Sequence, residues 1–239
     1  HGANLHGIDL SATDLTGANL SFQDLSSMDV SSIILDNTIL YNTNLTGANL
    51  SGKNLSGLNI KLSNLKFTDF EFSDLSFAHL TNSIMYTTNF SHTNLENAHL
   101  NDAYITNTDF SNSNISGVNF RHSFILSSDF RDTKLDNVDF SNARLAECNF
   151  DSQDFQYVDL TNVDFSTKII SEISISGSSF INADFSNKDL SSVIFSTQNF
   201  DLLPTDIDLL RTVIPSSSVT NLSGANLSGA NLSAKNISH

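Results

Sequence analysis

The sequence predicts an all-β fold, a parallel β-helix of about ten coils in which four pentapeptides close each coil. The first observation is an apolar residue at every fifth position: all 40 residues from Leu5 to Phe200 in steps of five are Leu, Ile, Val, Met or Phe. Five matches neither the strand period of 2 nor the helix period of 3.6. A residue at every fifth position can face one shared interior only if the chain turns by a fixed angle every five residues.

The residues around each apolar centre supply the turns. Asp or Asn stands one position before the centre in 27 of the 40 pentapeptides, and these side chains cap their own backbone and tolerate turn geometry. Glycine recurs two positions after the centre, as at Gly17 and Gly47. The position two before the centre is mostly small, as at Ala18 and Thr43, so we expect it to point inward as well.

Phenylalanines at a period of 20 indicate four pentapeptides per coil. They stand at residues 70, 90, 110, 130 and 150, and stacked coils place them in one aromatic ladder. Forty pentapeptides then form ten coils, a solenoid about 48 Å long at roughly 4.8 Å per stacked strand. We expect Phe110 to face Phe120, and Phe130 to face Phe140, across the core.

The pattern breaks after Phe200. Residues 205–214 place Ile207, Leu210 and Ile214 on one helical face, and Pro215 stops the helix. We expect three segments: the β-helix at 1–200, an insert with one short amphipathic α-helix at 201–219, and resumed repeats at 220–239 that form one further coil. Both ends of the chain lie within a repeat, which is typical of a piece cut from a longer protein.

Motifs such as Ala18-Asn19-Leu20-Ser21 and Ala183-Asp184-Phe185-Ser186 resemble those of the pentapeptide-repeat family. The resemblance covers residues 1–200 and extends to 220–239. It implies a right-handed, four-sided β-helix with the central residue and the small residue inside and the other three positions outside. Six long polar residues depart from the small residue that the family places inward, and we expect their side chains to escape outward through a local change of turn: Gln23, Lys53, Gln153, Lys168, Lys188 and Gln198.

Composition narrows the partners. Only 15% of residues are charged, yet the net charge is −15, which disfavours nucleic acid and anionic membranes. We therefore expect a protein partner or a neighbouring domain, no nucleic acid and no membrane span, and leave the oligomeric state open. Cys148 is the single cysteine, so no intrachain disulfide forms, and its small inward position predicts a buried thiol. Two locations are compatible with these features of the sequence: the bacterial cytoplasm, or a host cell after secretion.

The chain carries no nucleophile elbow, phosphate-binding loop or HExxH motif, so we expect no catalytic activity and no cofactor. His79 and His99 are four pentapeptides apart and should stack outward on neighbouring coils. A metal site needs three or four convergent ligands, and that column offers only these two. We therefore expect a surface pair of histidines and no metal site.

Apolar residues at outward positions mark the candidate binding surface. Folding the chain into coils of four pentapeptides places six of them on one side, which we call the apolar face: Phe67, Ile84, Tyr86, Tyr104, Phe124 and Leu126. Phe67 and three others lie two positions after successive centres, one on each side of a coil, and form the apolar belt: Leu62, Phe67, Phe72 and Phe77. We expect the apolar face to be exposed and to bind a partner; the alternative is that its ladder only stabilises the stack.

Three functions fit the sequence. The first is a protein-binding domain of a bacterial secreted effector, because a similar β-helix precedes the catalytic part in the HECT-like ubiquitin-ligase effectors. The second is DNA mimicry, as in family members that protect type II topoisomerases from quinolones. The charge density of this chain is low for a mimic: about one net negative charge per 3.4 Å of the solenoid, against about one per 1.7 Å in duplex DNA. The third is a structural spacer with no specific partner.

Overall fold

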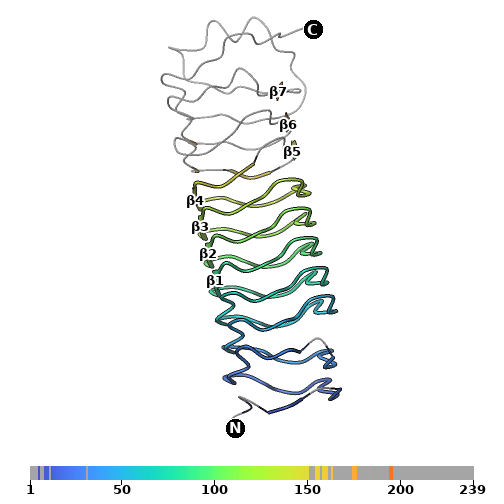
Figure 1. The fold of residues 1–239 in the computed structure, drawn as a ribbon. Helices are drawn as coiled ribbons and strands as arrows, with labels where there is room; N and C mark the ends of the chain where they lie inside the picture. The colour runs from blue at the N-terminus through green and yellow to red at the C-terminus, as the bar shows by residue number, and fades with distance from the viewer. Residues whose placement is uncertain are drawn as a thin grey trace, which may run out of the picture.

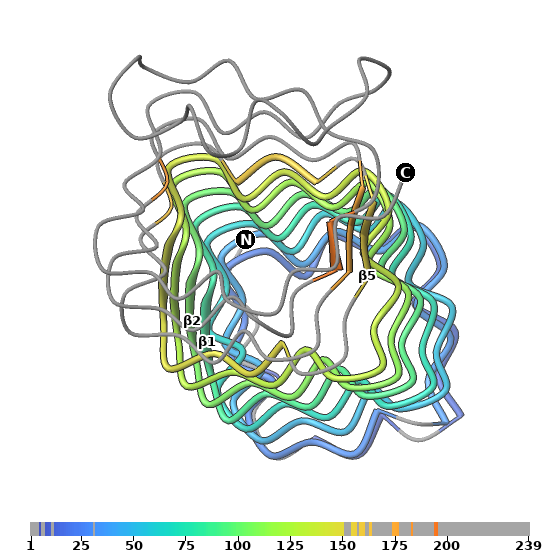
Figure 2. The same ribbon diagram turned by 90° about the horizontal axis from the view of Figure 1, so that it is seen from above.

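The computed structural model describes one solenoid built of stacked coils (Figure 1). The described residues are Leu5, 8–10, 12–30, 32–150, 154–156, 158–160, Val163, 174–176, Ala183 and 194–195. Viewed along the axis, the coils superpose on a common outline (Figure 2). The insert predicted at 201–219 with its helix, and the repeats at 220–239, lie outside the described residues. The total of ten coils therefore stays a prediction.

The length of each coil is the one that the sequence predicts. Parallel bridges join residues one position before a centre to their equivalents four pentapeptides away, from Asp14↔Ile34 to Asp139↔Asp159, always with the same offset. Four pentapeptides therefore close one coil, and the structure is consistent with a quadrilateral parallel β-helix. We name the four sides after the apolar centres of one coil: the Leu65, Phe70, Leu75 and Leu80 sides.

Short parallel strands run along two opposite sides. On the Leu65 side, one sheet has the order β1 (Ile84–Tyr86), β2 (Tyr104–Thr106), β3 (Phe124–Leu126) and β4 (Arg144–Ala146). On the Leu75 side, a second sheet has the order β5 (Asp154–Gln156), β6 (Ser174–Ser176) and β7 (Ile194–Phe195). Every strand pairs in register with the equivalent strand of the adjacent coil.

The corners explain the preference for Asp or Asn before each centre. The side-chain oxygen of Asp14 accepts a hydrogen bond from the backbone N–H of Thr16 at 2.9 Å, and the same bond recurs at most other Asp and Asn residues in this position. The residue two after the centre then adopts a positive φ, near 60°, in nearly every corner. This left-handed conformation suits Gly and Asn, which explains why they recur there.

The interior is a column of apolar side chains. The centres from Leu20 to Leu160 are all buried, and the small position beside each is buried in most coils. Hydroxyls at the small position donate to carbonyl oxygens of the core wall, as Thr68 Oγ1 does to Leu45 at 2.8 Å. Cys148 is buried as predicted.

Of the six long polar residues at small positions, Gln23 and Lys53 lie in the described part of the chain and behave differently from the expectation; the other four lie outside it. Gln23 is half-buried, and its corner keeps the hydrogen bond from its N–H to Leu20 O at 3.2 Å, so the predicted change of turn is wrong there. Lys53 is also half-buried, and its ammonium donates to Ile33 O at 2.6 Å. The ammonium thus finds a hydrogen-bond acceptor without leaving the coil wall.

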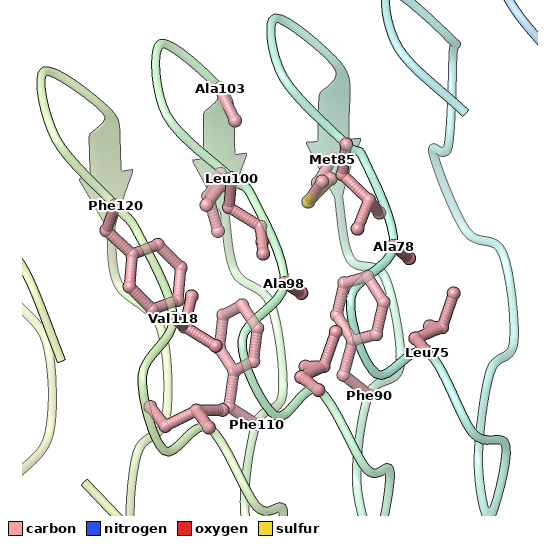
Figure 3. Close-up of a cluster of buried hydrophobic side chains, with 14 of the residues drawn as sticks. Leu75, Ala78, Met85, Phe90, Ala98, Leu100, Ala103, Phe110, Val118 and Phe120 are labelled. Atoms are coloured by element: carbon pink, nitrogen blue, oxygen red, sulfur yellow. The ribbon is translucent and has the colours of Figure 1, made fainter. Parts of the chain in front are cut away.

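Aromatic ladders fill the core from Phe70 onward. On the Phe70 side, rings of adjacent coils stack in parallel at 4.8–5.3 Å, and Phe120 stacks on Phe140 on the opposite side. The two ladders meet edge to face, with Phe110–Phe120 at 5.8 Å and Phe130–Phe140 at 5.8 Å. Figure 3 shows Phe90 and Phe110 stacked, with Phe120 reaching in from the other side. Both predicted contacts across the core are confirmed.

Phe130→Ala is expected to lower the free energy of unfolding by about 3–5 kcal/mol, because it empties the centre of both ladders. Phe130 contacts four other rings and is fully buried. Chemical denaturation followed by circular dichroism measures the change. A loss below about 1 kcal/mol would contradict the packing described.

Phe77→Asn is expected to raise the free energy of unfolding by about 1 kcal/mol. Phe77 holds a φ of 57° and is exposed, so Asn relieves left-handed strain without emptying the core. The matched control is Asn82→Phe in the next corner, which has a φ of 59° and should show the opposite change. A loss of stability in Phe77→Asn would mean that the ring packs favourably on the coil surface.

His79→Asn is expected to reduce the loss of stability on acidification. His79 stacks on His99 at 4.8 Å, and burial lowers the pKa of His79 below its ordinary value of 6.5, helped by the charges of His99 and Lys61. The unfolded chain therefore binds a proton more readily than the folded chain does. Stability from neutral His79 is present above pH 6.5 and is lost as the pH falls through the lowered pKa. The melting temperature across this range is the measurement, with His122→Asn as the control; an unchanged slope would contradict it.

Candidate functional site

The apolar face lies on the sheet β1–β4, where the backbone differs from the rest of the Leu65 side. Asp24, Asn44 and Asn64 precede their centres on this side, and each forms a single bridge followed by a turn. Where Ile84, Tyr104, Phe124 and Arg144 take that position, the chain forms three-residue strands instead. Ile, Tyr and Phe favour the extended conformation and lack the oxygen that caps the turn. The replacement is not sufficient by itself, since Ile34 and Ile39 also precede their centres and form single bridges, and β5 begins at Asp154. On the Leu65 side the strands form where replacements follow one another in adjacent coils of one column.

The strands point alternate residues outward, so each contributes two side chains to the face. Phe67, Ile84, Tyr86 and Tyr104 are exposed, Phe67 at 54% and Tyr104 at 62%. The rings of Phe67 and Tyr86 contact edge to face at 5.4 Å. These four of the six residues form the exposed part of the predicted apolar face.

Phe124 and Leu126 are less exposed than the sequence predicts; both are half-buried. The ring of Phe124 lies beside Tyr104 at 6.0 Å and under the guanidinium of Arg144, which is 5.2 Å from the ring centre. Leu126 lies in register between Thr106 and Ala146. Neighbouring rungs therefore cover this end of the face.

An open hollow of about 630 Å³ lies over the exposed part of the apolar face. Its walls are Lys66, Phe67, Ile84, Met85, Tyr86, Tyr104 and Thr106. Two tyrosines, one phenylalanine and one lysine around an otherwise apolar floor suit an apolar side chain that has a polar group beside it. The hollow offers a place for a protruding side chain of another molecule.

The apolar belt is exposed at all four corners of one coil. Leu62, Phe72 and Phe77 are exposed, as is Phe67, which the belt shares with the apolar face. All four have a φ between 57° and 60°, in the region that costs a residue with a Cβ about 1–2 kcal/mol. Only Phe72 gains a stacked ring partner, His92, at 4.9 Å. The belt thus combines backbone strain with apolar exposure.

The structure also exposes apolar residues outside the predicted surfaces. Ile34 and Ile39 stand one before their centres and Phe22 stands two after, and all three are exposed. Phe22 contacts Tyr41 edge to face at 5.6 Å. The rule that identified the apolar face, an apolar residue at an outward position, applies equally to these residues. They are scattered over two sides and form no comparable sheet within the described part of the chain.

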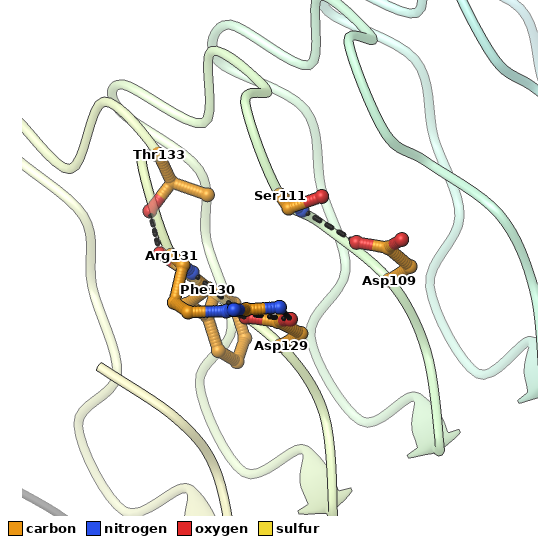
Figure 4. A network of polar contacts seen from close by, with 6 residues as sticks. All are labelled: Asp109, Ser111, Asp129, Phe130, Arg131 and Thr133. Atoms are coloured by element: carbon orange, nitrogen blue, oxygen red, sulfur yellow. Dashed lines mark hydrogen bonds and ion pairs between the residues drawn. The ribbon is translucent and has the colours of Figure 1, made fainter. Parts of the chain in front are cut away.

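Charges divide the Leu65 side from the other three. On each of the other sides a cation pairs with a carboxylate: Arg121 with Asp139, Arg131 with Asp129, and Lys134 with Asp136. Figure 4 shows Arg131 folded onto Asp129, which lies on the coil next to that of Asp109. Arg131 donates to both carboxylate oxygens of Asp129. Burial alone would raise the pKa of Asp129, but these bonds and the charge of Arg131 outweigh it, and the pKa is lowered.

The two cations on the Leu65 side, which flank the apolar face, have no such partner; among the described residues Lys61 on the Leu80 side has none either. Within the residues that the structure describes, neither Lys66 nor Arg144 has a carboxylate within ion-pair distance. Glu147, three residues after Arg144, instead accepts a hydrogen bond from Ser127 at 2.7 Å. Lys66 and Arg144 lie at the two ends of the apolar face, four coils apart, in a chain with 26 acidic residues.

Among the described residues, no group of three or more His, Cys, Asp or Glu side chains is placed to hold a metal ion. In the same part of the chain, no helix is long and apolar enough to cross a membrane. His79 and His99 stack on the Leu80 side as a pair, as predicted.

Solved structures share the fold at low sequence identity. The plasmid-mediated fluoroquinolone resistance protein QnrB1 is 22% identical, covers 78% of this chain and 89% of its own, and superposes with a TM-score of 0.59. HetL, a pentapeptide repeat protein involved in heterocyst differentiation regulation from the cyanobacterium Nostoc, is 21% identical, covers 95% of this chain and 87% of its own, and has a TM-score of 0.49. The likeness to QnrB1 concerns the fold alone. No curated protein matches the chain by sequence.

The sequence itself matches the profile of the pentapeptide repeats family in eight copies, within residues 1–29, 24–57, 38–76, 63–102, 88–121, 127–166 and 220–234. These ranges cover most of the chain and follow the five-residue pattern on which the coils are built. The chain therefore belongs to the pentapeptide repeats family.

Proposed function

We propose that this chain is a non-catalytic scaffold that binds another protein, or a neighbouring domain, through its apolar face. The observation that carries the proposal is the exposed sheet of Phe67, Ile84, Tyr86 and Tyr104 around the hollow. Exposed apolar surface of this kind, in contiguous patches, is typical of interaction sites. Tyrosine and phenylalanine are also enriched in the buried centres of protein interfaces.

The apolar face costs stability, because it gives up turn caps and exposes apolar surface. This cost favours a role in binding over a role in stabilising the stack alone. Asp or Asn at positions 84, 104 and 124 would cap the following N–H and face water, as Asn64 does for Lys66 in the same column. A ladder that served only stability would cover its own rings, as Phe124 is covered. Tyr104 instead remains 62% exposed. Burial against a partner would recover the free energy that this exposure forgoes.

The wider setting is part of the proposal. The scaffold would serve as the recognition domain of a bacterial secreted effector, with any catalytic part, such as a HECT-like ubiquitin ligase, in another domain. The bacterial cytoplasm and the host cell are the two compartments in which it would act.

DNA mimicry is the second candidate, and one feature favours it. The Phe70 side carries an acidic column with Asp69, Asp109 and Asp129, each bridged to the residue above or below it. However, Asn49, Asn89 and Asn149 interrupt this column, and Arg131 neutralises Asp129. A mimic needs an uninterrupted line of charge, so this side supports the second function less well than the apolar face supports the first.

Replacing Ile84, Tyr104 and Phe124 together with Asn restores the repeat pattern and tests the proposed function. We expect the melting temperature to hold or rise, since Asn caps the turns, while partner binding weakens at least tenfold because the face is lost. Binding is read by photo-crosslinking in living cells from a benzophenone side chain at Tyr86. The matched control position is Glu96, which has the same place in its pentapeptide on the opposite side and is exposed.

Crosslinks from position 86 that exceed those from position 96, and that disappear in the triple variant, support the proposal. Crosslinks no stronger than those from position 96, together with a clear loss of stability in the triple variant, would show that the ladder only supports the fold. A crosslink to a second copy of the chain would identify the partner as the protein itself.

A further inference from the structure

The two cations without a carboxylate partner, one at each end of the apolar face, indicate which charges its partner carries. Lys66 borders the hollow at one end, and Arg144 covers Phe124 at the other. Within the described residues, this is the one side on which no cation has a carboxylate partner, although the chain carries a net charge of −15. A cation placed at each end of an apolar stripe complements a partner with a carboxylate at each end of its own.

The spacing of the two cations sets the length of the partner element. They lie four coils apart, which is roughly 19 Å at about 4.8 Å per stacked strand. An α-helix covers that distance in about 13 residues, at about 1.5 Å per residue. The sheet is three residues wide, about 10 Å, which is close to the diameter of a helix with its side chains.

The backbone of the sheet argues for a helix over an extended strand. The main chain of β2 and β3 is paired on both sides by the neighbouring coils. These strands therefore have no free edge to which another strand could be added, and the contact must be made by side chains. A helix satisfies its own backbone and presents only side chains, so it can lie on such a face without leaving polar groups unpaired.

We propose that the apolar face binds an amphipathic α-helix of a partner protein that carries a carboxylate at each end of its apolar stripe. The helix lies along the solenoid axis across β1–β4. One large apolar side chain enters the hollow between Phe67, Tyr86 and Tyr104, and the two carboxylates pair with Lys66 and Arg144. The proposal rests on the proposed function and adds the class and orientation of the partner.

The test uses two synthetic helical peptides, each labelled with fluorescein, with leucines along one face. They differ only at two positions about 13 residues apart, near the two ends of the helix, which carry Glu in one peptide and Lys in the other. Fluorescence anisotropy measures the affinity of each peptide for the whole chain. We expect the Glu-ended peptide to bind about tenfold more tightly, since two attractive pairs replace two repulsive ones, and this preference to fade as salt is raised.

Charge reversal on the protein completes the test. In the double variant Lys66→Glu and Arg144→Glu, the preference should reverse in favour of the Lys-ended peptide. The control double variant, Lys61→Glu and Arg121→Glu, makes the same change in net charge on the Leu80 side and should retain the wild-type preference. Circular dichroism verifies that both variants fold.

Three results would overturn the inference: no binding of either peptide, equal binding of both, or the same reversal in the control variant. Each is distinguishable from a failure of the proposed function. If crosslinking from position 86 still depends on the apolar residues, the face binds a partner of another shape or charge. If that crosslinking fails as well, both proposals fail together.

Discussion

The stacking of each coil on the previous one, by main-chain hydrogen bonds between adjacent coils, is the interaction on which the rest of the structure depends. Asn44 shows how it works: its N–H donates to Gln23 O at 2.9 Å, and its own carbonyl accepts from Leu25 N at 2.8 Å. Because every coil repeats this register, equivalent side chains lie directly above one another. The stacked Phe rings at 4.8–5.3 Å reflect the spacing of the strands to which they are attached.

This regularity explains how much of the fold the sequence could predict. The inward centres, the coil of four pentapeptides, the Asp and Asn caps, and the contact between Phe110 and Phe120 all follow from position within the repeat, and the structure confirms them. Two features could not be read from position. The formation of three-residue strands at Ile84, Tyr104 and Phe124 depends on how equivalent residues of successive coils pair. The half-burial of Phe124 depends on where the side chain of Arg144 lies.

The candidate site could be predicted in outline for the same reason. An apolar residue at an outward position is visible in the sequence, and this rule identified Tyr104 and Phe67. It also applies to Phe22 and Ile39, which the structure exposes. Backbone strain does not separate these residues from the apolar face, because Phe22 and Phe67 both have a left-handed φ, of 63° and 57°. The difference lies in strand pairing: Ile84, Tyr104 and Phe124 join one sheet, whereas Ile39 forms only isolated bridges. Positions that break a local rule at a cost are those most often retained for function.

The solenoid also limits how such a surface can be built. A single extra residue would move every later side chain out of its column, and one extra pentapeptide would turn every later coil by one side. The apolar face and its two flanking cations, from Lys66 to Arg144, need five coils in one register, so this part of the chain tolerates neither change. The five-residue pattern runs through it without a slip. With the backbone satisfied by stacking, recognition is left to side chains, and the order of replacements along one column, from Lys66 through Tyr104 to Arg144, sets which partner surface fits.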